Sequence, residues 1–159
     1  MKKFLLLFAL LTCCINSFSQ SEESLRDYFE RNASTLDPIE GIYDVESYGD
    51  YITPFVHQKY PKSNSTFYIM KDGNKYKVYV KAGDTFGESG IKIEPIAGNA
   101  YRFYFETSYT RIYLENRNHF EANIELDNES GKAFTGNDRL ARSVRIILKN
   151  DAIKTFPNN

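Results

Sequence analysis

Apolar and polar residues alternate along most of the chain beyond residue 66, which is the pattern of β-strands that bury one face. The clearest run, residues 119–126, places four apolar side chains on one face: Phe120, Ala122, Ile124 and Leu126. Similar runs predict strands at residues 67–70, 75–81, 91–94, 101–107, 111–115 and 142–149. Short alternating strands of this kind indicate an antiparallel sheet with one face on the core and one face in water.

Residues 22–32 follow a helical period instead, and they form the one convincing helix outside the N-terminal apolar run. Ser21 can cap this helix, acidic residues occupy its first turn and Arg31 its last, which suits the helix dipole. Three side chains share an apolar stripe: Leu25, Tyr28 and Phe29. We expect the stripe to pack over a barrel end or a sheet edge, and binding of a partner is the alternative.

The stretch Leu36–Val45 leads from this helix into the first strand, which we expect at residues 41–48. Pro38 disfavours a helical residue before it, so the backbone there is extended or turning. Gly41 allows a tight bend, and Tyr43 can bring a large aromatic ring beneath whatever closes over it. Gly41 and Tyr43 are therefore the predicted structural anchors.

The segments between strands contain turn-forming or strand-breaking residues. Gly49-Asp50 is a turn signal, and the prolines in residues 51–66 predict a long loop that includes at most an edge strand. Residues 82–90 and 127–138 are rich in glycine and polar residues, and both are predicted as turn-rich loops. After residue 149 we expect a short tail that folds back through Ile153 and Phe156.

About eight or nine short strands with short connections predict an up-and-down meander. A sheet of this length protects its edges best by curling into a barrel. The predicted fold class is therefore all-β: an antiparallel up-and-down meander that closes into a barrel of about eight strands, with one short N-terminal helix.

The N-terminus has the features of a secretory signal peptide. Two lysines precede the apolar run at residues 4–11, and Ser17 and Ser19 permit cleavage before Gln20. The run is too short to cross a membrane. A buried N-terminal helix and a lipoprotein modified at Cys14 are the alternatives.

These features predict an exported protein, periplasmic or extracellular, with no integral membrane segment after processing. The predicted organisation is a signal peptide at residues 1–19, an N-terminal helix and lead-in at 20–39, and a β-barrel domain at 40–159.

Composition limits the classes of partner. Cleavage after Ser19 leaves 140 of the 159 residues, which suits one domain. Both cysteines are removed, so the core has to hold the exported chain together without a disulfide. Loss of two lysines leaves 18 basic against 21 acidic residues, a net charge of about −3. This balance predicts no nucleic-acid partner and no attraction to an anionic membrane.

A helical lead-in, then Gly41-Ile42-Tyr43 at the start of the first strand, then a meander over roughly residues 40–149, resembles the lipocalin-like (calycin) barrels. Those proteins carry Gly-x-Trp at this place, and the ring closes the barrel floor under an arginine from near the final strand. The resemblance implies that Tyr43 closes the floor, partnered by Arg139, Arg142 or Arg145. Residues 36–43 also resemble the opening of small secreted bacterial β-rich modules of unassigned function, which implies a module rather than an activity.

No catalytic or cofactor motif stands out, so we expect neither enzyme activity nor a cofactor. No serine lies in a Gly-x-Ser-x-Gly elbow. One strand face carries residues that fit either a surface metal site or a solvated charged face, and we favour the charged face: His119, Glu121, Asn123 and Glu125. Three outward tyrosines suit either cross-strand pairing or contact with a sugar or protein: Tyr79, Tyr104 and Tyr113.

The first functional hypothesis is a secreted or periplasmic barrel that binds a small apolar or amphipathic molecule. The predicted ligand-binding residues are inward-facing aromatics: Tyr76, Phe103 and Phe105. The loop at residues 51–66 would cover the mouth. The alternatives are a non-enzymatic interaction or structural module with a packed core, and an envelope hydrolase, which the sequence supports least.

We predict removal of the N-terminus close to Ser19, because small residues follow the apolar run only there. Mass spectrometry of the exported protein should give the mass of a chain that begins at or near Gln20. An intact Met1, or a lipid on Cys14, would contradict the assignment.

Overall fold

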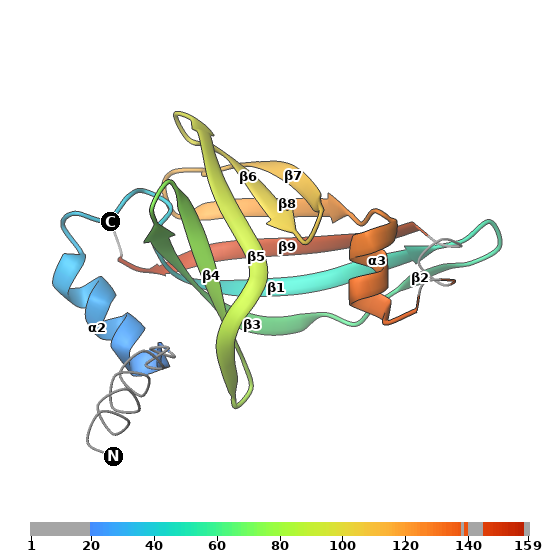
Figure 1. Cartoon of the computed structure of the whole chain (residues 1–159), viewed down its shortest axis with the longest axis horizontal. Helices are drawn as coiled ribbons and strands as arrows, with labels where there is room; N and C mark the ends of the chain where they lie inside the picture. Colours follow the sequence, from blue (N-terminus) through green and yellow to red (C-terminus); the bar gives the residue numbers. More distant parts are fainter. Residues whose placement is uncertain (1–19, 138, 140–144, 158–159) are drawn as a thin grey trace, which may run out of the picture.

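One antiparallel sheet dominates the computed structural model, which describes residues 20–137, 139 and 145–157 (Figure 1). Its strands are β1 (Gly41–Ile52), β2 (His57–Lys59), β3 (Ser63–Asp72), β4 (Lys75–Ala82), β5 (Thr85–Ala97), β6 (Ala100–Phe105), β7 (Ser108–Tyr113), β8 (His119–Glu125) and β9 (Arg145–Phe156). The helices α2 (Glu22–Asn32) and α3 (Asn128–Thr135) accompany it.

The sheet curls into a barrel in which eight strands follow the order β7-β6-β5-β4-β3-β1-β9-β8, and β2 pairs only with β1. Each of these pairings is antiparallel. Because β1 pairs with both β3 and β9, the meander closes on itself except at a seam where β7 lies beside β8. The predicted fold class is confirmed as a nearly closed eight-stranded barrel, but α3 adds a second helix.

The inner face of the barrel is filled by apolar side chains. The four residues predicted to face inward from residues 119–126 are all buried, which confirms that alternation. The largest cluster inside draws on every strand from β3 to β9 together with β1, and its aromatic members are Tyr43, Phe67, Tyr76, Tyr101, Phe103 and Phe120. Rings of this size fill an eight-stranded interior over the part of the barrel that they occupy.

Helix α2 has the predicted bounds, and Ser21 caps it by accepting a hydrogen bond of 3.1 Å from the backbone N–H of Ser24. It packs on the outer wall formed by β1, β3 and β4, not over a barrel end or a sheet edge as predicted. The reason lies in residues 67–70, where alternate side chains face the inner core and the helix. A strand buried on both faces has a continuous apolar sequence.

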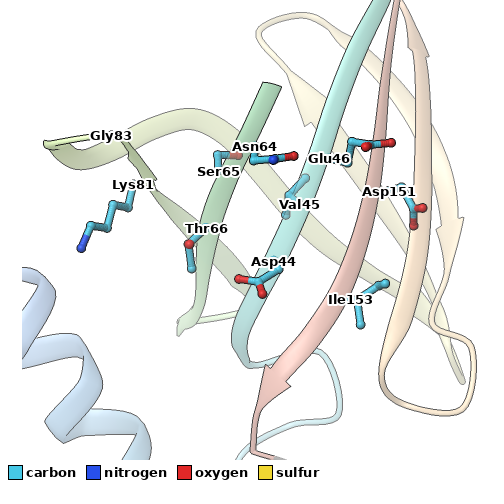
Figure 2. Close-up of a pocket in the computed structure, with 10 residues that line it drawn as sticks. All are labelled: Asp44, Val45, Glu46, Asn64, Ser65, Thr66, Lys81, Gly83, Asp151 and Ile153. Atoms are coloured by element: carbon cyan, nitrogen blue, oxygen red, sulfur yellow. The ribbon is translucent and has the colours of Figure 1, made fainter. Parts of the chain in front are cut away.

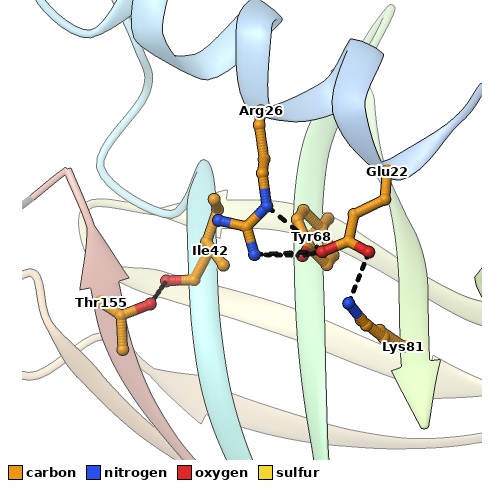
Figure 3. Close-up of polar contacts among 6 residues, drawn as sticks. All are labelled: Glu22, Arg26, Ile42, Tyr68, Lys81 and Thr155. Atoms are coloured by element: carbon orange, nitrogen blue, oxygen red, sulfur yellow. Dashed lines mark hydrogen bonds and ion pairs between the residues drawn. The ribbon is translucent and has the colours of Figure 1, made fainter. Parts of the chain in front are cut away.

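Glu22 attaches the start of α2 to the barrel through a polar cluster (Figure 3). Its carboxylate accepts hydrogen bonds of 2.6 Å from both the Tyr68 hydroxyl and the Lys81 ammonium. These two bonds lower the pKa of Glu22 to about 2, and burial together with the Glu22 contact raises the pKa of Tyr68 to about 12. Arg26 binds Glu22 and Tyr68 as well. The polar cluster adds to the apolar contacts of Leu25 and Phe29, so the apolar stripe of α2 packs against the barrel of the same molecule.

The lead-in between α2 and β1 closes one end of the barrel, which we call the closed end. Ile39 belongs to the inner cluster, and the carboxylate of Glu40, buried beside it, accepts hydrogen bonds of 2.9 Å from the backbone N–H groups of Asp37 and Lys71. Gly41 then enters β1 with a φ of +145°. A Cβ at this position would overlap the carbonyl oxygen of Phe156, so only glycine fits.

Helix α3 occupies residues that were predicted as a turn-rich loop. The Asp127 side chain caps it by accepting a 2.8 Å bond from the N–H of Ser130, and Gly136 ends it in the left-handed conformation. The Ser130 hydroxyl accepts bonds from the N–H groups of Thr107 and Ser108 at 3.2 and 3.0 Å. The helix start thereby ties the β6–β7 turn to the end of β8, across the seam of the barrel.

The region predicted as a long loop at residues 51–66 is mostly strand. Gly49-Asp50 lies within β1, which continues to Ile52 and forms a hairpin with β2. The prolines are compatible with this arrangement because Pro54 lies in the turn and Pro61 follows a three-residue edge strand. The predicted loop over the mouth is therefore an extension of the sheet.

Two further segments, one predicted as a loop and one as a tail, are largely strand. Within residues 82–90 a tight turn at Gly83-Asp84 joins β4 to β5 directly. The predicted tail beyond residue 149 is the second half of β9, which pairs with β1 as far as Phe156. The predicted start of this strand at Arg142 lies outside the described residues.

Replacement of Tyr43 by alanine should reduce the free energy of unfolding by about 3–5 kcal/mol, as for other large aromatic deletions in a core. The ring is fully buried, lies 5.3 Å from the Phe120 ring, and its hydroxyl donates a 2.9 Å bond to the carbonyl of Ile39. Tyr43→Phe is the control, because it keeps the ring and should cost much less. Urea midpoints of Tyr43→Ala within error of the parent would show that the ring does not support the barrel.

Candidate functional site

Lys154 is a buried cation at the closed end of the barrel. It lies on β9 opposite Tyr43 and is only 6% exposed. Its ammonium donates a hydrogen bond to the carbonyl of Pro38 and lies 5.3 Å from the centre of the Tyr43 ring, a cation–π contact. Burial lowers the pKa of Lys154 to about 8, and the carboxylate of Glu40 opposes that shift.

Lys154 occupies the position for which the lipocalin resemblance implied an arginine. Arg145 lies at the opposite end of β9, where it pairs with Glu125 at 2.5 Å, so it does not contact Tyr43. Arg139 is exposed, and Arg142 lies outside the described residues. Lys154 was not among the predicted site residues because its segment was assigned to a tail. Residues 145–156 contain no glycine or proline, and this absence of a strand-breaking residue is the signal that would have extended β9.

The predicted ligand-binding residues lie in packed surroundings. Tyr76 and Phe103 belong to the inner cluster. The distance between ring centres is 6.1 Å for Tyr76 and Tyr101 and 6.3 Å for Phe103 and Phe120. Phe105 packs against a neighbouring cluster further from the closed end. The two concavities described below are not lined by any of the three, and their role in binding stays a prediction.

A concavity of about 300 Å³ lies on the inner face of β1, β3 and β9, away from the closed end. We call it the mouth concavity, and its lining residues are Ser47, Tyr48, Gly49, Tyr60, Pro61, Ser63, Leu148, Lys149 and Asn150. The register places it inside: Ser47 pairs with Asn150 and Ser63, and it lies on the same face of β1 as the buried Tyr43 and Val45.

The mouth concavity combines apolar walls with a small polar group. The Ser47 hydroxyl donates a 2.7 Å bond to the side-chain oxygen of Asn150. The Tyr60 ring lies so close to Gly49 that a Cβ there would be 3.1 Å from it, and Tyr60 also contacts the Tyr51 ring edge-on at 6.4 Å. Both Tyr60 and Pro61 come from the segment predicted to cover the mouth. The site therefore offers an aromatic wall, the Leu148 side chain, and hydrogen-bonding groups on one side.

A second concavity of about 560 Å³, the outer concavity, has a different chemistry (Figure 2). It lies over the outer wall of β1, β3 and β9, and its polar lining residues include Asp44, Glu46, Asn64, Thr66, Lys81 and Asp151. Several of these already have partners: Glu46 pairs with Lys62, Lys81 with Glu22, and Asp151 with His119. Its polar lining does not suit an apolar ligand.

Two of the four residues predicted on the charged face of β8, His119 and Glu125, form ion pairs, and the other two are exposed. His119 approaches Asp151 at 2.7 Å and Glu115 at 3.3 Å. Burial lowers the pKa of His119, but the two carboxylates outweigh it and raise that pKa above its ordinary value. Glu125 is engaged by Arg145 at the far end of the strand. Within the described ranges, no three histidine, cysteine or acidic side chains are grouped to hold a metal ion.

The predicted outward tyrosines do not form one continuous surface. Tyr79 is buried, stacked 6.1 Å from the Phe86 ring beside α2. Tyr104 pairs across strands with Tyr109, with ring centres 5.6 Å apart. Tyr113 is exposed. Cross-strand pairing therefore accounts for part of this set.

In comparisons with known proteins, no protein-family model matches the chain, and no curated protein matches its sequence. The structure itself defines the class of protein as a nearly closed, antiparallel eight-stranded β-barrel. In the part of the chain that the structure describes, no helix is long and apolar enough to span a membrane.

Lys154 should make stability rise with pH above about pH 8. Its pKa is lowered to about 8 in the folded protein from 10.5, so between these values the unfolded chain binds a proton that the folded chain does not. From about pH 8 to about pH 10 this linkage adds on the order of 2 kcal/mol to the free energy of unfolding. Urea unfolding across this range should show the rise in the parent and its loss in Lys154→Met.

The control is Lys92→Met, because Lys92 also lies in a strand but its side chain is exposed. We expect it to keep the pH slope of the parent. A Lys154→Met variant with the slope of the parent would contradict the assignment of this titration to Lys154.

Proposed function

We propose that the protein binds a small apolar or amphipathic molecule at the mouth concavity. The observation that carries the proposal is an inner-face concavity of about 300 Å³ with an aromatic wall and one polar side. That volume lies at the lower limit for small-molecule sites, which are concave, mainly apolar and equipped with a few polar groups that orient the ligand. The predicted signal peptide supports a role outside the cytoplasm.

The residues suggest how such a ligand would be oriented. Its apolar part would lie against Tyr60 and Leu148, where water is displaced from apolar surface. A hydroxyl or carbonyl group would face Ser47 and Asn150, whose mutual bond leaves further donor and acceptor capacity. The packed rings of the inner cluster form the floor, so the ligand would be short and would not enter the closed half of the barrel.

A second candidate is a non-enzymatic interaction or structural module. The observation that favours it is the dense inner cluster, which occupies the closed half of the barrel with aromatic rings. A barrel filled by its own side chains needs no ligand for stability. In this case the mouth concavity would hold only water.

Titration with an environment-sensitive apolar dye separates the two candidates. We expect saturable binding by the parent, and a reduction of at least about tenfold in affinity for Ser63→Trp, because the indole would occupy the concavity. Asn64→Trp is the matched control, since this neighbouring residue of β3 lines the outer concavity and its substitution should leave binding unchanged. The chain contains no tryptophan, so the new indole also reports the dye by energy transfer.

Two results would count against the proposal. Absence of saturable binding by the parent would favour the packed module. Loss of binding in Phe103→Trp with no effect of Ser63→Trp would place the ligand among the predicted residues of the core instead.

A further inference from the structure

The turn between β1 and β2 lies at a projecting end of the sheet (Figure 1). It exposes apolar side chains to solvent. Phe55 is 94% exposed and Val56 is 53% exposed, and Pro54 precedes them. A phenylalanine in water on a projecting turn loses the burial that usually stabilises such a residue. We call residues 53–56 the hairpin tip.

The backbone N–H donors of the hairpin tip are satisfied within the turn. The Thr53 N–H donates a 2.8 Å bond to the carbonyl of Val56. The Thr53 hydroxyl oxygen accepts bonds from the N–H groups of Phe55 and Val56 at 3.2 and 2.9 Å. Because Pro54 has no N–H, every backbone donor of residues 53–56 has a partner inside the tip. Such a turn can leave water with little cost from unpaired donors.

The charge around the hairpin tip differs from that of the whole chain. Residues 51–62 contain no aspartate or glutamate, but they include Lys59 and Lys62. The nearby carboxylate of Asp50 is bound by His57 at 3.2 Å and Lys149 at 2.5 Å, and Glu46 is paired with Lys62. The net negative charge, which argues against attraction to an anionic membrane, therefore does not describe this end of the molecule.

We propose that the hairpin tip inserts Phe55 and Val56 into the interface of a lipid bilayer that contains anionic lipid. Tyr51 and Tyr60 lie on the same hairpin, nearer the barrel than the tip. With the tip inserted, they would lie at the level of the lipid headgroups, where tyrosine is enriched in membrane proteins. The exposed Lys59 lies at the same level and would face lipid phosphates. A convex tip of two apolar residues suits shallow insertion, whereas stable protein interfaces bury far larger surfaces.

The inference does not rest on ligand binding at the mouth concavity, although Tyr60 and Pro61 link the two regions. Docking at this hairpin would hold the mouth of the barrel toward the bilayer. The two proposals are separable, because the tip residues do not line the concavity.

The absence of native tryptophan makes insertion directly measurable. Phe55→Trp gives a single indole at the tip, and Tyr113→Trp gives one at an exposed position on β7, away from the hairpin. Both are prepared from the exported protein, so they share the same N-terminus. Vesicles of phosphatidylcholine, with and without phosphatidylglycerol, and with brominated acyl chains in parallel samples, are then added.

We expect the emission of Phe55→Trp to shift to shorter wavelength and to be quenched by the brominated chains, while Tyr113→Trp shows neither change. In vesicle flotation, Phe55→Ser should weaken partitioning at least about tenfold, because its apolar side chain is lost. Tyr113→Ser should match the parent. Lys59→Gln should weaken binding to the anionic vesicles about fivefold, and added salt should reduce that difference.

Three outcomes would overturn the proposal. If the emission of Phe55→Trp changes with neither vesicle type, the hairpin tip does not insert into a bilayer, and contact with a protein partner would explain its exposure instead. Vesicle binding unaffected by Phe55→Ser would reduce the association to surface charge alone. Equal quenching of the indoles in Tyr113→Trp and Phe55→Trp would show that the hairpin tip does not insert in preference to the rest of the surface.

Discussion

The contact between Gly41 and the carbonyl of Phe156 constrains how the barrel can close. It brings the first strand and the last strand together where the chain enters the sheet. Tyr43 can then pass beneath Lys154, and the lead-in can cover both, with its carbonyls at Pro38 and Ile39 accepting their polar groups. A barrel has no free edges only if its ends meet, so this junction determines whether the other strands form a barrel or an open sheet.

The opposite closure, between β7 and β8, depends on different chemistry. No continuous ladder joins these strands in the described part of the sheet, where Glu115 and His119 form an isolated bridge. The N-terminus of α3 supplies the missing connection through Ser130, whose hydroxyl accepts two backbone donors and donates to the carbonyl of Phe105. The seam is thus held by a small cluster of side-chain hydrogen bonds around Ser130 at one end and by a bridge at the other.

Alternation predicted most of the sheet because it depends only on which side of a strand meets the core. The inward residues of β4 and β8 could be read directly, and so could α2, whose cap and apolar stripe agree. Helix α3 was hidden by Gly131 in its middle, although Asp127 and Gly136 are the cap residues of a helix. Lys154 was missed because its segment was assigned to a tail, and its burial could not be read from the sequence because charged residues usually lie at the surface. Partners distant in sequence, such as Pro38 and Tyr43, determine its burial.

The location of the candidate site follows from side-chain size along the inner face. Toward the closed end, β1 and β3 present Tyr43 and Phe67 to the interior, and β8 presents Phe120. Further along the same face β1 presents Ser47 and Gly49, and β3 presents Ser63. Large residues fill the interior at the closed end, and the small residues near the mouth leave space. The strands cannot move inward to fill this space because hydrogen-bond ladders fix the distance between them. A concavity at this place is therefore encoded in the sequence, as a change from large to small residues at every second position of two paired strands.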